Sequence, residues 1–519
     1  MIQTGGERRC HICTLAVLIF MSIGVFAFIM NAPLSHDEHM YITAGRLAEA
    51  QVIYRDFAYL QMPYLPFIYA AFFKLTGTGY YLLAGRVLSS IFMFFSVLFI
   101  YLISYRVSRS LFVSLCMAAL MVFNKIIIQT MGYSWNNIMP IAFTVAAFYV
   151  FMLSCTEKKI KSAWIFLSGI LLSAAVGVKL FYAAVLPPFV VTSLIYPRSF
   201  NPGIRFKKCF LPLAAGILTG FLPVFYLMLK DMPAFMFDNV GYHNLTAVWK
   251  GVAEYSLSEV VIGKFRYAKT VMKEPAYVVL LTGALFAFFG AAGTVRKMQG
   301  NVRIVFPVYF FLSFLLAVST LFVIFVPSPL QTQYFAVPVP FLIIFMVSAY
   351  DLVIGPNRIF WKGLLVYFVA VSMVFGGMKV VKSWQDIMPV DGWTGVNIHK
   401  ISQNIRACLG PVNNGDRMAT LSPIYALEGG IPVYEEFATG PFLYRVGDLM
   451  TEKQRKTYKG VSPESLGRFL CENPPKAVFT GFEGELDAPF VRYAEQNGYR
   501  KLPGDFGGGV LYIKEQIKK

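Results

Sequence analysis

Eleven long apolar runs are the feature of this 519-residue sequence that most limits what it can fold into. A helix that crosses the hydrocarbon core of a bilayer needs about 17–25 predominantly apolar residues. The chain is 57% hydrophobic and 14% charged, whereas an ordinary globular chain carries roughly a quarter charged residues. This composition excludes a series of soluble domains, a disordered chain and a disulfide scaffold, so we expect a polytopic α-helical membrane protein. The runs lie near 11–31, 81–105, 110–128, 138–154, 163–178, 180–196, 209–229, 276–295, 304–326, 334–350 and 360–378.

The formal net charge of +18 belongs entirely to the apolar part of the chain. Residues 384–519 contain 16 Lys and Arg and 16 Asp and Glu, so this segment is neutral. In membrane proteins, Lys and Arg gather in cytoplasmic loops, where they face anionic lipid. We therefore expect these basic residues to face a lipid bilayer, and we expect no binding of nucleic acid. The basic residues stand in alternate loops: Arg8 and Arg9; Arg106 and Arg109; Lys158, Lys159 and Lys161; Arg198, Arg205, Lys207 and Lys208; Arg296, Lys297 and Arg303; Arg358 and Lys362.

The stretch 163–196 decides the number of spans, because Lys179 interrupts it. The basic loops on either side of this stretch share one face of the membrane only if it crosses twice, as a hairpin. The positive-inside pattern therefore predicts eleven spans and a cytoplasmic N-terminus. It places two long loops, at about 32–80 and 230–275, on the outer side. The expected location is the plasma (inner) membrane, crossed many times.

The neutral segment 384–519 is expected to form a small α/β domain on the outer side, after a membrane module over 1–383. Residues 476–482 and 509–514 have strand-like composition. Residues 486–497 look helical and end before Gly498, a plausible C-cap. A pairing of Cys408 with Cys471 would suit an oxidising compartment, and the sequence leaves it open. The stretch 425–444, with Glu435 and Glu436 among aromatics, indicates either an acceptor contact or an ordinary turn.

Two adjacent carboxylates, Asp37 and Glu38, follow the first span directly. A partly desolvated carboxylate beside another has its pKa raised toward the working range of a general base. If residues 36–50 form a helix along the membrane surface, Asp37 and Tyr41 share a face and Glu38 points about 100° away. The two acids would then have different roles. The alternative is a solvated helix start, where the helix dipole favours acidic residues.

Three motifs in the first outer loop resemble those of the GT-C glycosyltransferases. They are HDEHMYITAGRL (36–47), YRDF (54–57) and MPYLPFIYAAFFKLTG (62–77). The nearest branch is the protein O-mannosyltransferase and aminoarabinose-transferase-like (dolichyl-phosphate-mannose mannosyltransferase-like) group. The group often has a His or Lys before these prolines, where this chain has Gln61-Met62-Pro63.

This resemblance implies an enzyme that takes a sugar from a polyprenyl-phosphate carrier on the outer leaflet and passes it to a hydroxyl, usually with inversion. It implies a hexosyl- or pentosyltransferase, and the acceptor is an envelope lipid, glycan or protein. Asp37 would be the catalytic base. Glu38 would orient the acceptor or a metal. Tyr41, Arg55, Asp56 and His243 would shape the sugar and acceptor site.

The resemblance also implies where the donor phosphate binds. Lys179 matches the lysine of the family's hairpin, and the alternative is a lysine that snorkels at a helix end. Arg86, at the start of the second long run, is a second candidate cation. Tyr334, in QTQYFAVP (331–338), would contact the carrier, although Gln333 replaces the family's basic residue. The resemblance also implies a site for a divalent metal between Glu38 and His243. The sequence has no HExxH-type spacing that would support this site.

Two other functions compete with the enzyme. A transporter or flippase of a lipid-linked saccharide would place ionisable residues in the middle of spans and often show inverted repeats, and we find neither in the sequence. An envelope scaffold would not need eleven spans for anchoring. The sequence identifies neither the sugar nor the acceptor.

Overall fold

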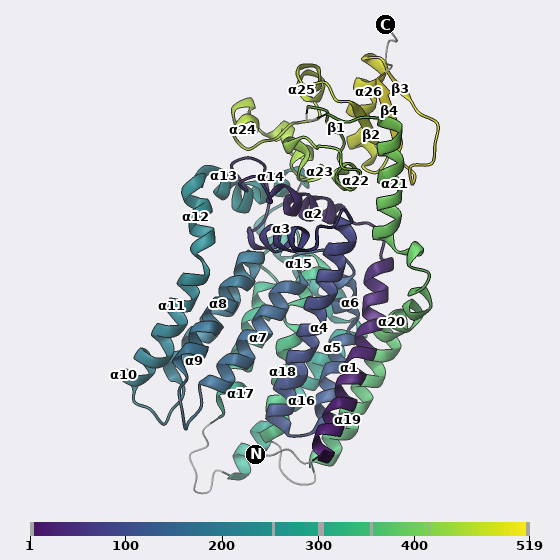
Figure 1. Cartoon of the computed structure of the whole chain (residues 1–519). Helices are drawn as coiled ribbons and strands as arrows, with labels where there is room; N and C mark the ends of the chain where they lie inside the picture. Colours follow the sequence, from purple (N-terminus) through teal and green to yellow (C-terminus); the bar gives the residue numbers. More distant parts are fainter. Residues whose placement is uncertain (1–4, 252–254, 299–305, 353–356, 414, 515–519) are drawn as a thin grey trace.

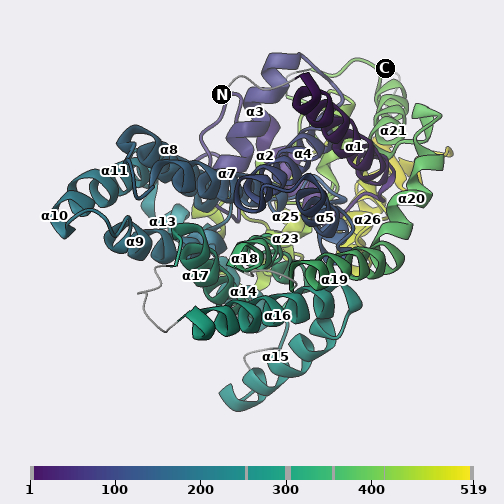
Figure 2. The ribbon, with the colours of Figure 1, turned by 90° about the horizontal axis from the view of Figure 1, so that it is seen from below.

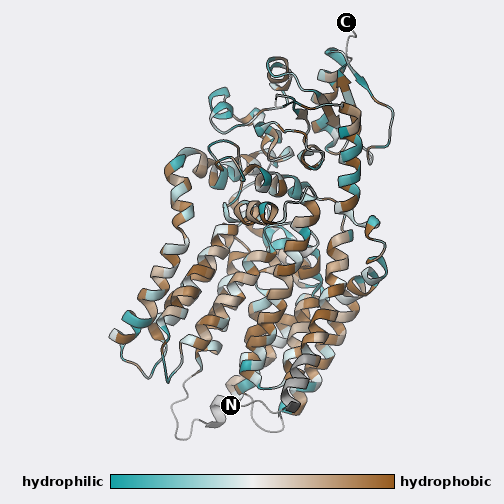
Figure 3. Cartoon of the chain, viewed as in Figure 1, coloured by the Kyte–Doolittle hydropathy of each residue, from teal (hydrophilic) through white to brown (hydrophobic). Residues whose placement is uncertain are grey.

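The computed structural model describes residues 5–251, 255–298, 306–352, 357–413 and 415–514. It is a bundle of helices capped at one end by a smaller α/β domain (Figure 1). The bundle is brown with hydrophobic residues along its length, and the cap is mixed (Figure 3). Helix α1 (Gly5–Asn31) begins at the end of the bundle opposite the cap. The chain is thus a multi-pass membrane protein with an α/β cap at one end of its helices.

All eleven apolar runs are helical. Five helical segments are long and apolar enough to span a membrane, and a pair bent by 41°, Pro202–Gly220 with Leu222–Lys230, makes a sixth. Five further apolar helices contain 10–17 residues. The prediction of helices at these positions is confirmed, and the count of eleven crossings stays a prediction. The main helices are α4 (Tyr81–Ser108), α5 (Leu111–Val122), α7 (Ile138–Ser154), α8 (Ser162–Val178), α9 (Leu186–Ile195), α11 (Leu211–Gly220), α12 (Leu222–Lys230), α16 (Pro275–Met298), α17 (Val308–Val323), α18 (Val339–Leu352), α19 (Asn357–Ser372) and α20 (Met378–Ser383).

The hairpin predicted over 163–196 is present. Helix α8 ends at Val178, Lys179 has an extended backbone, and the 3₁₀ helix η1 (Leu180–Val185) leads into α9. The loop before α8 meets the loop after α9, because the Glu157 carboxylate accepts hydrogen bonds from the backbone N–H groups of Arg198 and Ser199 at 3.0 and 2.7 Å. The two basic loops therefore lie at the same end of the bundle. Figure 2, seen from below, shows α8, α9 and α11 grouped on one side of it.

Short helices from the two long loops cross the capped end of the bundle (Figure 1). They are α2 (His36–Leu47) and α3 (Tyr64–Thr76) from the first loop, and α13 (Met232–Met236), η3 (Phe237–Gly241), α14 (Tyr242–Trp249) and α15 (Leu257–Met272) from the second. Buried Asp238 joins the two loops, since its carboxylate accepts a hydrogen bond from the backbone N–H of Tyr59 at 2.8 Å. Residues from both loops are thereby held over one region of the bundle.

The cap contains a four-stranded sheet with the order β1-β2-β4-β3. Strand β1 (Met418–Ala419) is parallel to β2 (Ala477–Thr480), and β4 (Val510–Lys514) is antiparallel to both β2 and β3 (Tyr499–Lys501). The strands predicted at 476–482 and 509–514 are confirmed. Helix α26 (Ala488–Gln496) confirms the predicted helix, which ends near Gly498, a residue with φ of 74°. Cys408 and Cys471 are both free and exposed, so the pairing left open by the sequence is not formed.

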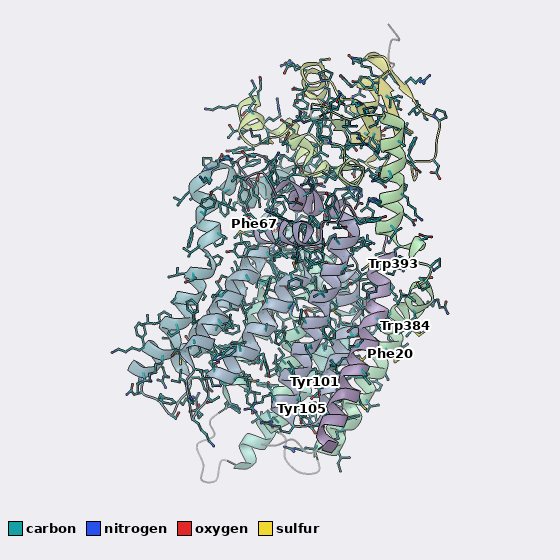
Figure 4. The ribbon with its side chains drawn as sticks, in the orientation of Figure 1. Phe20, Phe67, Tyr101, Tyr105, Trp384 and Trp393 are labelled. Carbon is teal, nitrogen blue, oxygen red and sulfur yellow. The ribbon has the colours of Figure 1, made fainter. Side chains whose placement is uncertain are left out.

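Helix α1 packs against the segment that leads into the cap, and the cap itself contacts the first loop. Figure 4 shows Phe20 of α1 beside Trp384, and their ring centroids are 4.6 Å apart. Helix α21 (Thr394–Leu409) then enters the cap, and its His399 stacks on Tyr80 at 3.7 Å. An ion pair at 2.8 Å joins His36 of α2 to Glu483. These contacts hold the cap over the helices that cross the end of the bundle.

Candidate active site

A cavity of about 570 Å³ lies where the two long loops, the hairpin and the cap meet. Its walls come from segments far apart in the sequence, which the crossing helices and the cap bring together. Its polar lining contains one carboxylate among the described residues, together with three Lys or Arg side chains. The lining residues used below are Asp37, Tyr41, Gln61, Asn136, Lys179, Phe181, Tyr242, His243, Lys250, Gln331, Gln333, Tyr334, Phe442 and Arg445.

Asp37 is the carboxylate of this cavity, and the start of α2 determines where it points. Ser35 and Glu38 form a capping box that fixes the first turn, with the Ser35 backbone N–H donating to Glu38 Oε2 at 3.0 Å. Asp37 therefore faces the cavity together with Tyr41, one turn later. Burial raises the pKa of Asp37 above its ordinary value, against the opposing effects of Lys179, Arg445 and His36. A carboxylate in this state suits proton abstraction near neutral pH.

Lys179 is the buried cation of the cavity, with 8% of its surface exposed. Its ammonium donates a hydrogen bond to Oδ1 of Asn137 and lies 5.4 Å from the centre of the Tyr334 ring. Asn137 in turn donates to Gln333 Oε1 at 3.0 Å. Among the described residues, no carboxylate lies within ion-pair distance of Lys179. Burial lowers the pKa of Lys179 to about 8, while Asp37 opposes the shift.

Arg445 and Phe442 enter the cavity from α23 (Pro441–Arg445) of the cap, and the sequence analysis did not identify them. In the stretch 425–444, the predicted candidates for an acceptor contact were Glu435 and Glu436. Glu435 instead accepts a hydrogen bond from Gln51 at 3.1 Å, outside the cavity. Lys250, at the end of α14, is the third cationic side chain of the lining besides Lys179 and Arg445. It was not predicted from the sequence. The cavity thus has an excess of positive charge around Asp37.

Comparisons with known proteins agree with this architecture. The family model "Dolichyl-phosphate-mannose-protein mannosyltransferase" matches residues 61–197. The solved structure of ArnT from Cupriavidus metallidurans bound to undecaprenyl phosphate superposes with a TM-score of 0.59 at 11% identity, over 96% of this chain and 97% of that one. This chain therefore has the fold of ArnT, and its residues 61–197 are similar to the mannosyltransferase family.

Two further solved structures are similar to this chain. ArnT from the same organism in the apo state also gives a TM-score of 0.59 at 11% identity, with 98% of both chains covered. The oligosaccharyltransferase of Archaeoglobus fulgidus tethered with an acceptor peptide gives 0.49 at 12% identity, over 97% of this chain and 74% of that one. Among curated proteins, none matches the sequence.

Glu38 and Arg86 do not line the cavity, and the catalytic and phosphate-binding roles expected for them stay predictions. Both side chains are 0% exposed, and Arg86 donates to both Glu38 oxygens at 3.0 and 2.9 Å. Glu38 also accepts from the backbone N–H of Ser134 at 2.9 Å. The remaining Arg86 donors bind backbone oxygens at the end of α1, those of Ile29, Met30, Ala32 and Pro33. The pair therefore has its hydrogen bonds satisfied within the protein and joins α1, α2 and α4.

Arg55 and Asp56 also lie outside the cavity lining, and the sugar-binding role expected for them stays a prediction. They form a partly exposed ion pair at 2.8 Å, and Asp56 accepts from the backbone N–H of Val52 at 2.7 Å. Neighbouring Tyr54 has a φ of 71° and donates its hydroxyl to the Gln61 carbonyl at 2.7 Å. The YRDF segment thus shapes the loop that carries Gln61 to the cavity.

The metal site expected between Glu38 and His243 lacks one of its ligands. His243 lines the cavity, and burial lowers the pKa of its imidazole. The Glu38 carboxylate is bound to Arg86 instead. No group of three or more His, Cys, Asp or Glu side chains suited to a metal ion occurs within the part of the chain that the structure describes. These residues do not fit a metal held by Glu38.

Proposed function

We propose that this protein is a GT-C glycosyltransferase, which transfers a sugar from a polyprenyl-phosphate carrier to a hydroxyl of an envelope lipid, glycan or protein. The observation that carries the proposal is the cavity in which one desolvated carboxylate, Asp37, lies with the unpaired cation Lys179. This pairing supplies a base for a hydroxyl and a counter-charge for a departing phosphate. The fold supports it, because the ArnT structure of this fold is bound to undecaprenyl phosphate.

In the proposed reaction, Asp37 accepts the proton of the acceptor hydroxyl as the hydroxyl oxygen attacks the anomeric carbon. The bond between that carbon and the phosphate oxygen breaks, and its electron pair leaves with the lipid phosphate. Lys179 stabilises the charge that develops on this phosphate. A single displacement of this kind inverts the anomeric centre. The Tyr334 ring, stacked on Phe181 at 5.1 Å, forms an apolar wall beside Lys179 where a carrier can pack.

The cavity is proposed to open at the outer face of the membrane, with the cap outside and the basic loops in the cytoplasm. A reporter fused at residue 200 is then expected to show a cytoplasmic location. A reporter fused after residue 519 is expected to show an outer location. Opposite ends of the bundle carry these two regions, which supports the assignment. Finding both reporters on the same side would contradict it.

Lys179→Ala is expected to lower kcat/KM by about 10²–10³-fold, the effect of losing one donor to a developing oxyanion. The free amine is not a cation, so wild-type kcat/KM should also fall as the pH rises through the Lys179 pKa of about 8. Rates of the purified enzyme with a polyprenyl-phosphate sugar, measured over a range of pH, give both quantities.

Lys179→Arg is the matched control for this pH dependence. A guanidinium stays protonated in this range, so the alkaline limb near pH 8 should disappear from its kcat/KM profile even if the rate is lower. An Ala variant with wild-type turnover and an unchanged alkaline limb would return Lys179 to the role of a snorkelling lysine.

Mass spectrometry tests the function as a whole. Envelope lipids and glycans from cells with and without the gene are expected to differ by one hexose or pentose on one acceptor. The purified protein in detergent micelles should then transfer that sugar, because micelles have no two compartments between which a flippase could act. A difference in cells without any transfer in micelles would favour the flippase.

A further inference from the structure

Arg445 reaches the cavity from the cap, while the other cations of the lining come from the membrane module. It ends the short helix α23, which follows Gly440 with a φ of 60°. A Cβ at Gly440 would lie 3.1 Å from the Leu421 carbonyl oxygen and 3.4 Å from Cβ of His39. The cap backbone therefore approaches α2 closely at this point. This contact fixes Arg445 relative to the helix that carries Asp37.

The guanidinium of Arg445 is held by aromatic rings and leaves donors unused. Its Cζ lies 4.9 Å from the centre of the Trp249 ring and 4.8 Å from that of Phe442. One terminal nitrogen donates to the Tyr242 hydroxyl at 3.1 Å. Its Nε is buried without a hydrogen-bond partner, and no carboxylate lies within ion-pair distance, as far as the described residues extend. Because aromatic rings cover the flat faces of the guanidinium, a ligand would bind at its edge, where the N–H groups point.

An arginine with this environment is suited to a planar, bidentate contact with an anion. Arg86 shows the contrast, since its donors are used by Glu38 and by backbone oxygens. A guanidinium presents its N–H donors in a fixed fork that matches phosphate oxygens, and it remains charged at all relevant pH values. Lys250 lines the same cavity as Arg445, so a second cation faces the space that an anion would occupy.

We propose that Arg445 binds the phosphate of the polyprenyl-phosphate donor from the side of the cap, while Lys179 binds it from the hairpin. The donor site is then complete only when the cap is docked on the bundle. This inference rests on the proposed function. It assigns the cap a direct role in donor binding. The charge on the phosphate grows as the sugar leaves, so Arg445 stabilises the product lipid phosphate as well as the donor.

The test measures the Kd of a polyprenyl phosphate for the full-length protein in detergent, by native mass spectrometry or calorimetry. Arg445→Ala is expected to raise this Kd at least about 10-fold, because a charge-assisted contact is lost. Arg445→Lys keeps the charge without the fork and should give a smaller increase. Lys179→Ala serves as the positive comparison. If Arg445→Ala fails to fold, Arg445→Gln, which can still donate to Tyr242, takes its place.

Two variants control for indirect effects. Arg468→Ala removes an exposed arginine of the same domain and should keep the wild-type Kd. Glu483→Gln removes one contact between the cap and His36 without touching the cavity. The stacking of His399 on Tyr80 and the approach of Gly440 to α2 still hold the cap in place, so this variant should also keep the wild-type Kd. An increase in Kd for Glu483→Gln equal to that for Arg445→Ala would show that docking alone explains the effect, and would overturn the inference.

The results separate this inference from the proposed function. A wild-type protein that does not bind polyprenyl phosphate contradicts the proposed function, and the inference falls with it. Weakened binding in Lys179→Ala together with an unchanged Kd in Arg445→Ala contradicts the inference alone. An increase for Arg445→Ala that is absent from both control variants supports it.

Discussion

Asp37→Asn is expected to lower turnover by at least about 10²-fold while the donor still binds, because a positioned general base contributes about 10²–10⁴-fold. An acceptor hydroxyl is a weak nucleophile, whereas a lipid phosphate leaves with little help from an acid. The main catalytic contribution that the protein has to make is therefore the general base. Asparagine keeps the shape of the side chain and removes its basicity. The rate of the purified variant, with its Kd for polyprenyl phosphate, measures both parts of this expectation.

The wild-type pH profile offers an independent check on Asp37. Burial raises the pKa of this carboxyl, and only the deprotonated form is a base. The rate should therefore fall as the pH drops through a pKa above the ordinary value of a free aspartate. Lys179 lowers this pKa, so a variant without that lysine should lose activity at a higher pH.

Asp56→Asn is the comparison variant for Asp37→Asn. It removes a carboxylate from the same loop, but this one is paired with Arg55 outside the cavity lining. We expect turnover close to that of the wild type. An Asp37→Asn enzyme with a near-normal rate, next to an impaired Asp56→Asn enzyme, would move the base to Asp56 and contradict the site described here.

Much of the fold could be predicted because membrane helices follow from short-range properties of the sequence. Apolar runs have the length of a span, and the charges of the loops decided that Lys179 stands at the turn of a hairpin. The ends of α8 and α9 and the contact of Glu157 with Ser199 agree with this prediction. The bend between α11 and α12 was beyond reach, because it depends on how neighbouring helices pack.

The candidate site was only partly predictable, and the reason differs between residues. Asp37, Tyr41, Lys179, His243 and Tyr334 all line the cavity, as their places in the outer loops or at the outer ends of apolar runs suggested. Adjacent acids on a helix point about 100° apart, and the sequence alone did not decide which of the two faces inward. A signal existed, since Ser35-x-x-Glu38 is a capping box that commits Glu38 to the helix start.

Arg445 could not have been found in the same way. It follows a stretch rich in aromatics and acids within a neutral domain, and nothing in its sequence neighbours distinguishes it from other surface arginines. Its position depends on the docking of the cap onto α2 and α14, which are about 400 and 200 residues away along the chain. Long-range contacts of this kind are set by tertiary packing.

Arg86→Gln is expected to destabilise the protein by about 3–5 kcal/mol, because it leaves Glu38 as a buried charge without its partner. The same change removes the guanidinium that binds backbone oxygens at the end of α1. Thermal unfolding of the purified protein in detergent should show a much lower midpoint. Glu38→Gln should have a similar effect, since it leaves Arg86 unpaired.

The double variant and a surface pair show whether this loss comes from the buried pair itself. Arg86→Gln combined with Glu38→Gln should cost less than the sum of the two single changes, because neither charge is then left alone. Arg46→Gln breaks the partly exposed pair between Arg46 of α2 and Glu49, just beyond the end of this helix, and should cost at most about 1 kcal/mol. If Arg86→Gln instead kept the wild-type midpoint and lost the binding of polyprenyl phosphate, Arg86 would be a ligand of the donor, and the structural role assigned to the pair would be wrong.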